Sequence, residues 1–177
     1  MRITGTRGGL VAVATGLFAL GFAGPVSAVG TTATVTVTGG ALSITVPVDA
    51  GNLGTAANTV LGSTITGPLG PVQVNDARDA AAGSGWVATV ISTAFTPPAG
   101  PAIPASDVGY TVGSITQVGT ATYTANNPSN LTGVVAAVTA TAITGDNSAT
   151  WDPTISVTVA GGMAAGVYSG TITHSVS

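Results

Sequence analysis

The chain has 177 residues, only 5% of them charged, and its formal net charge is −3. An ordinary soluble domain has about 25% charged residues, and a nucleic-acid-binding surface needs many Lys and Arg side chains to neutralise phosphates. Lys and Arg together number 3 here, which excludes nucleic acid as a partner. The absence of Cys excludes disulfide scaffolds, Fe–S clusters and Cys-ligated zinc sites.

Residues 1–28 are typical of a secretory signal peptide. Arg2 and Arg7 make the start positive, residues 10–23 form an apolar run, and a Val-Ser-Ala tripeptide supplies small residues for a signal peptidase. The apolar run is shorter than the ~20 residues that span a bilayer. We therefore predict that this segment is cleaved off, and that a secreted single domain over 29–177 remains, without a membrane span.

Alternation with a period of two dominates the mature chain and predicts β-strands. Residues 33–38 alternate Ala or Val with Thr, and 42–46 alternate large apolar residues with polar ones. The same pattern predicts further strands at 72–75, 86–95, 110–118, 120–125, 134–143, 154–159 and 167–176. About nine or ten short strands at this spacing predict an all-β antiparallel β-sandwich of the Ig-like or Greek-key type.

Two segments interrupt the strand pattern. Residues 77–82 are rich in Ala and could form a short helical turn, while 95–104 are rich in Pro and predict a loop inside the single domain. The predicted strands are almost free of charge. Their edges therefore lack the charged residues that prevent edge-to-edge pairing.

Few side chains of the mature chain could carry catalysis. His174 is the only His, and the alternation places it on the same face as Ile172 and Val176, which predicts a half-buried strand residue. The Asp residues in 75–79 and 146–152 could bind calcium, but Asp and Asn are also ordinary turn residues. We expect no enzyme activity, no cofactor and no metal site.

Trp86 and Trp151 are the candidate binding residues, because exposed indole rings stack on sugars; the alternative is that both rings belong to the core. Asp76, Arg78 and Asp79 are the candidate members of a structural ion pair. Arg78 is the only Lys or Arg of the mature chain, and residues two apart in an extended strand point to one face. We expect the pair to be partly buried.

Two stretches of the chain resemble the signature of the WxL family of bacterial surface proteins. An Asp-x-Arg element at 76–78 precedes a Gly-Trp strand at 85–86, and 154–173 is similar to the closing hairpin of that family. In place of the family's two Trp-x-Leu tripeptides, the chain has Trp-Val-Ala at 86–88 and His-Ser-Val at 174–176. The resemblance covers nearly all of the mature chain.

The resemblance implies secretion, a β-sandwich-like fold and non-covalent binding to peptidoglycan, with Trp86 as a contact residue and without catalysis. We therefore predict a secreted, non-catalytic module of the bacterial cell wall and cell surface. Its partner would be peptidoglycan, another wall glycan or another surface protein. Two alternatives stay open, namely a self-assembling surface or fibre subunit, whose partner is a second copy, and a secreted hydrolase.

Overall fold

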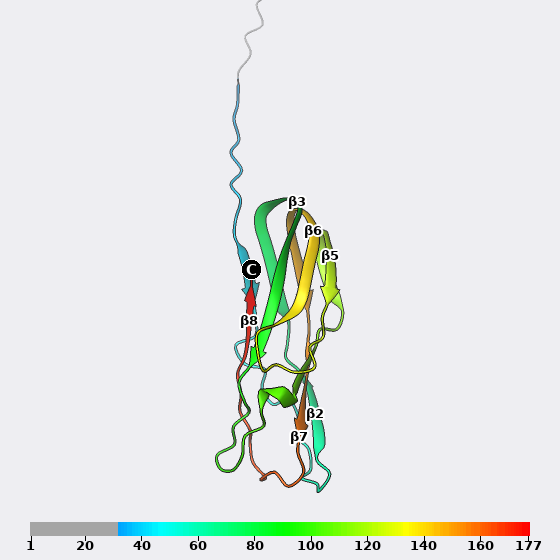
Figure 1. The fold of residues 1–177 in the computed structure, drawn as a ribbon. Coiled ribbons are helices and arrows are strands. Elements are labelled where there is room, and N and C mark those ends of the chain that lie inside the picture. Colours follow the sequence, from blue (N-terminus) through cyan, green and yellow to red (C-terminus); the bar gives the residue numbers. More distant parts are fainter. Residues whose placement is uncertain (1–31) are drawn as a thin grey trace, which may run out of the picture. The chain divides into compact units, whose positions relative to one another are not determined.

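The computed structural model describes residues 32–177, so the predicted signal peptide, with Arg2 and Arg7, lies outside the described residues. The contacts divide the chain after Thr36, and the architecture below concerns the unit Val37–Ser177. Figure 1 shows this unit as a β structure. Within the described part of the chain, no helix is long and apolar enough to cross a membrane.

Eight antiparallel strands and one short 3-10 turn make up the described structure. They are β1 (Leu42–Thr45), β2 (Ser63–Pro68), β3 (Val72–Ser92), η1 (Ala105–Asp107), β4 (Val108–Thr111), β5 (Ile115–Ala125), β6 (Val135–Trp151), β7 (Thr154–Val159) and β8 (Ile172–Val176). The predicted all-β antiparallel β-sandwich is confirmed, and its Ig-like subtype stays a prediction. The described structure has eight strands where about nine or ten were predicted, because 72–75 and 86–95 join into the long strand β3 and 33–38 forms no strand, while 110–118 is divided between β4 and β5.

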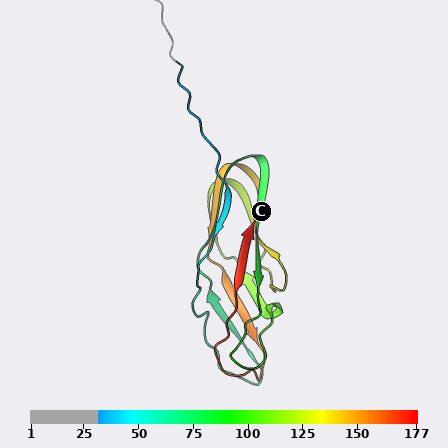
Figure 2. The ribbon, with the colours of Figure 1, turned by 90° about the vertical axis from the view of Figure 1, so that its left-hand side faces the viewer.

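The strands form two sheets. The larger has the order β1-β3-β6-β5, with β8 also paired to β3, and the smaller has the order β2-β7-β4. The strands β1 and β8 share β3, since Leu42 lies opposite Asp76 and Val176 lies opposite Ala88. Figure 2 shows β2 and β7 side by side, at the end of the unit that lies away from the turn shared by β3 and β6.

The long strands β3 and β6 bend together. They pair from Val72 opposite Trp151 to Val90 opposite Val135, with four register shifts on the way. In Figure 1 both ribbons turn over at the same end, which we call the bend end. The first half of β3 and the second half of β6 thus face the other two halves across the core.

Glycines and one further residue with a left-handed backbone conformation make this bend possible. Gly83 (φ 89°) and Gly145 (φ 67°) have a backbone conformation that favours glycine, and Asp79 (φ 52°) shares it. At Gly85, a Cβ atom would lie 2.7 Å from the carbonyl oxygen of Ala140. The Ala-rich segment 77–82 is therefore part of bent strand β3, and the short helical turn predicted there is wrong.

Three other local predictions have clear outcomes. Residues 33–38 are assigned to no strand, and the side chains of Val35 and Val37 are 88% and 89% exposed, so alternation alone did not produce a paired strand. The strand β2 was missed, because its alternation contains a single large apolar residue, Ile65. The Pro-rich segment 95–104 is a loop, as predicted, closed by a bridge between Phe95 and Ile103.

Both sheets contribute to one core. Its largest fully buried side chains are Trp86, Trp151, Tyr110, Leu131, Ile143 and Ile155. The two Trp residues belong to opposite ends of this core, because Trp86 lies near the bend and Trp151 ends β6. Each indole N–H is the start of a buried hydrogen-bond network.

Candidate functional site

The predicted ion pair forms between Asp76 and Arg78 at the bend end. Arg78 Nε lies 2.8 Å from Asp76 Oδ1, and Arg78 Nη2 lies 3.0 Å from Asp76 Oδ2, which is a bidentate arrangement. The side chain of Asp76 is completely buried, whereas that of Arg78 is 37% exposed. The hydrogen bonds from Arg78 hold the pKa of Asp76 below its usual 3.8, against the opposing effect of burial.

Asp79 does not belong to this ion pair, so that part of the prediction is wrong. Among residues 32–177 the one salt bridge is that of Arg78 with Asp76. Asp79 instead donates its backbone N–H to Asp146 Oδ1 over 2.9 Å. The left-handed backbone of Asp79 interrupts the alternation here, and the register of β3 shifts between Asp76 and Ala80.

Asn147 links the ion pair to two aromatic residues. Its Nδ2 donates to Asp76 Oδ2 over 3.3 Å, and its Oδ1 accepts from Trp86 Nε1 at 3.0 Å and from the hydroxyl of Tyr123 at 3.2 Å. We call Asp76, Arg78, Trp86, Tyr123 and Asn147 the bend network. Sequence reasoning missed Asn147, which looked like a turn residue; it became a buried link only because β6 pairs with β3.

A second network lies in the other half of the core, and we call it the open-end network. Trp151 Nε1 donates to the hydroxyl oxygen of Tyr110 over 2.8 Å, and that oxygen lies 3.1 Å from His174 Nε2. The buried Tyr110 hydroxyl has no other acceptor among the described residues, so we assign its proton to Nε2 of His174, which places the hydrogen of the neutral ring on Nδ1.

Burial controls the ionisation of the open-end network. It raises the pKa of Tyr110 above its ordinary 10.0 and lowers the pKa of His174 from 6.5 to about 4, so both groups are neutral at pH 7. The prediction of a half-buried strand His is confirmed. Its Nδ1 is buried and has no hydrogen-bond partner among the described residues.

The structure contradicts the use of Trp86 and Trp151 as stacking residues. Both side chains are only 2% exposed, and both indole N–H groups are bonded inside the protein. A sugar ring has no open face of either indole to contact, so the core alternative is the one observed. Both rings belong to the core to which the two sheets contribute.

The two predicted Asp clusters approach each other at the bend. Asp79 contacts Asp146 through its backbone N–H, and Asn147 contacts Asp76. Asp152 is not brought into this contact; it follows the end of β6. Over the described range 32–177, no group of three or more acidic or His side chains could together hold a metal ion.

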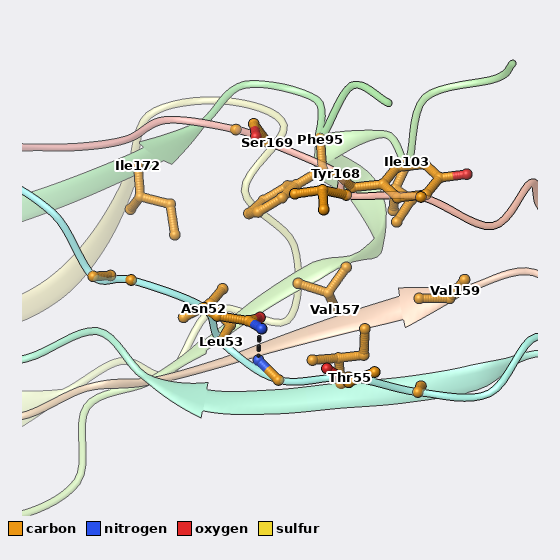
Figure 3. Close-up of a pocket in the computed structure, with 18 of the residues that line it drawn as sticks. Asn52, Leu53, Thr55, Phe95, Ile103, Val157, Val159, Tyr168, Ser169 and Ile172 are labelled. Carbon is orange, nitrogen blue, oxygen red and sulfur yellow. Dashed lines mark hydrogen bonds between the residues drawn. The ribbon is translucent and has the colours of Figure 1, made fainter. Parts of the chain in front are cut away.

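A cavity of about 920 Å³ lies between two loops and the end of the core opposite the bend, which we call the open end. One loop is 46–58, which precedes β2, and the other is 163–171, which precedes β8. Figure 3 shows Phe95, Tyr168 and Ile103 on one side of the cavity, with Val157 and other apolar side chains facing them. His174 also lines this cavity. Sequence reasoning missed the cavity, since its walls come from segments far apart in the chain.

Comparisons with family models, with curated proteins and with solved structures find no match to this chain. The resemblance to the WxL family therefore stays a prediction that rests on the residues at 76–88 and 154–176.

Proposed function

We propose that the mature chain is a secreted, non-catalytic module of the bacterial cell surface that binds peptidoglycan or another wall glycan without a covalent bond. The signal-peptide pattern and the WxL-like residues support secretion and wall association. One structural observation carries the non-catalytic part. Two of the groups that could act in catalysis, Arg78 and His174, are bonded to Asp76 and Tyr110 inside the two networks.

The geometry around His174 also argues against the hydrolase alternative. A His that acts as a general base is usually oriented by a carboxylate and lies within reach of a nucleophile. His174 instead faces the hydroxyl of Tyr110, and its ring lies 5.6 Å from that aromatic ring, centroid to centroid. Burial also lowers the pKa of His174 to about 4, which makes it a weak base at neutral pH.

The surface composition decides what kind of wall contact is available. Arg78 is the only Lys or Arg after position 28, so the mature chain cannot be drawn to anionic wall polymers by net charge. Binding would use the Thr, Ser and apolar side chains of the exposed surface. Such contacts resist salt, whereas attraction between exposed charges is screened within ~3 Å at 1 M salt.

A sedimentation assay with purified peptidoglycan tests this proposal. The mature protein should sediment with the polymer at low salt and, to the same extent, at 1 M NaCl. Folded Trp86→Phe should sediment equally well, because its ring is buried. Failure of the wild-type protein to sediment, or release by salt, would contradict the proposal.

A second candidate function, self-assembly, is favoured by a separate observation. The strand β5 is an edge of the larger sheet, has 11 residues and contains no charge and no Pro. Its Val118 is 68% exposed. The segment 33–38, with its two exposed Val residues, has the alternation needed to add to such an edge of a second copy.

Sedimentation velocity over a range of protein concentrations tests self-assembly. The wild-type protein should form larger species as its concentration rises, and Val118→Lys should abolish them by placing a charge on the β5 edge. Val60→Lys is the matched control, because Val60 is 94% exposed and lies outside every strand. A wild type that stays monomeric, or equal effects of the two substitutions, would contradict strand addition at β5.

A further inference from the structure

The cavity between loops 46–58 and 163–171 has the size and lining of a small-molecule site. Pockets for such ligands have volumes of about 300–1,000 Å³ and mostly apolar walls with a few polar groups. The cavity here has a volume of about 920 Å³. Its walls include Leu53, Phe95, Ile103, Val157 and Ile172.

One wall residue offers an unused hydrogen-bond donor. His174 lines the cavity, and its buried Nδ1 has no partner in the described structure. With the Tyr110 proton assigned to Nε2, this nitrogen carries the hydrogen of the neutral ring. A buried donor without a partner is costly, so an oxygen acceptor placed against it would be favourable.

The charges around the cavity select the kind of acceptor. The lining contains no Lys or Arg, and it contains one acidic residue, Asp49. The neutral His174 ring supplies no positive charge either. A carboxylate would therefore lose its hydration without gaining a cation.

We propose that this cavity binds a neutral, largely apolar molecule that carries one oxygen acceptor, such as a carbonyl group, and that a small shift of the His174 ring on binding uncovers Nδ1, which then donates to this oxygen. The apolar part contacts the side chains of Phe95, Ile103 and Val157. This proposal does not depend on where the chain contacts the wall, so it goes beyond the proposed function and stands without it.

Nile red, a neutral and apolar dye with a carbonyl group, is a suitable probe. Its fluorescence should rise and shift to shorter wavelength when it is titrated with the mature protein, and 2-nonanone should displace it. Nonanoate has the same chain length but is anionic at pH 7, and it should displace the dye at least about tenfold less effectively. No change in dye fluorescence, or equal displacement by the two competitors, would overturn the proposal.

A substitution at the mouth of the cavity locates the dye. Thr55 is exposed and lines the cavity, so Thr55→Trp should fill the entrance without disturbing the core and should abolish dye binding. Val134→Trp is the matched control, since Val134 is also exposed, lies outside the strands and does not line the cavity. Dye binding that survives Thr55→Trp, or that is lost equally in Val134→Trp, would overturn the location.

A pair of substitutions at His174 tests the hydrogen bond itself. His174→Phe removes the donor and should weaken 2-nonanone about 2- to 10-fold, the loss expected for one hydrogen bond. His174→Asn is the control, because its side-chain amide can place an N–H near the position of Nδ1 and should keep part of the affinity. Equal affinity of wild type and a folded His174→Phe for 2-nonanone would overturn the assigned donor, and the Thr55→Trp result still tests the cavity if His174→Phe does not fold.

Discussion

The two ends of the core satisfy a buried indole N–H group in different ways. Each encloses a Trp whose indole N–H must find an acceptor after burial. At the bend end, Trp86 donates to Asn147, and the network ends in the ion pair of Asp76 with Arg78. At the open end, Trp151 donates to Tyr110, and the network ends at a nitrogen of His174 without a partner.

This difference separates a structural network from one that is available to a ligand. The bend network contains Arg78, the only Lys or Arg after position 28, and Arg78 also donates to the carbonyl oxygen of Gly85, so the bend is held from several sides. The open-end network is neutral and borders a cavity. A closed polar network stabilises one arrangement of its segments, whereas an open one leaves a polar group for a further partner.

The largest expected effect comes from breaking the ion pair at the bend. Arg78→Ala leaves the carboxylate of Asp76 buried without its partner, and we expect a loss of about 3–4 kcal/mol in the free energy of unfolding. This is the lower part of the range for a buried pair, because Arg78 itself is 37% exposed and partly screened by solvent. Chemical denaturation followed by circular dichroism measures the loss.

Arg78→Lys is the matched control for this substitution. It keeps the positive charge but cannot make the bidentate contact, so it should cost about 1–2 kcal/mol. A stability of Arg78→Ala within a few tenths of a kcal/mol of the wild type would show that the ion pair contributes as little to stability as an exposed surface pair.

Acidification should affect the open end before the bend end. Burial lowers the pKa of His174 from 6.5 to about 4, so the unfolded chain binds a proton in this window that the folded chain does not. Stability is therefore complete above pH 6.5 and falls as the pH drops to 4, by up to about 3 kcal/mol at about 1.4 kcal/mol per pH unit. Urea denaturation at several pH values measures this slope.

His174→Phe removes the titrating group and should flatten the stability curve between pH 6.5 and pH 4. The carboxyl of Asp76 affects stability only at a lower pH, because its pKa in the folded protein lies below 3.8. Its contribution to stability is present above pH 3.8 and is lost as the pH falls further. An unchanged slope in His174→Phe would contradict the depressed pKa of this residue.

Replacing each Trp by Phe compares the two networks directly. Trp86→Phe and Trp151→Phe each remove an indole N–H and some core volume, and we expect about 1–2 kcal/mol for each. The acceptors keep another partner in both cases, since Tyr123 still contacts Asn147 and Tyr110 still contacts His174. A loss near zero in thermal or urea denaturation at one end would show that its indole hydrogen bond is not formed.

The smallest effect is expected at Asp79. Its carboxylate makes no salt bridge in the described chain, and its contact with Asp146 uses only the backbone N–H. Asp79→Asn keeps a residue that tolerates the left-handed backbone and should change stability by less than about 0.5 kcal/mol. A loss of stability comparable to that of Arg78→Ala, measured in the same denaturation assay, would indicate that Asp79 takes part in the ion pair after all.

The sequence by itself determined the properties that depend on neighbours along the chain. Alternation of apolar residues with Thr predicted the all-β antiparallel sandwich, and the spacing of Asp76 and Arg78 predicted their pairing. It also placed His174 on a half-buried face. These predictions succeeded because side-chain direction in a strand has a period of two, whichever strand lies beside it.

Only the tertiary structure decided which faces became buried and which groups met. The alternation of residues 33–38 resembles that of β1, yet only β1 found a partner strand. Trp86 and Asn147 are 61 positions apart and meet because β3 and β6 bend together. The cavity beside His174 likewise depends on two distant loops. Local periodicity shows which side chains share a face, but contacts between segments far apart in the chain decide which strand pairs with it and whether that face is covered.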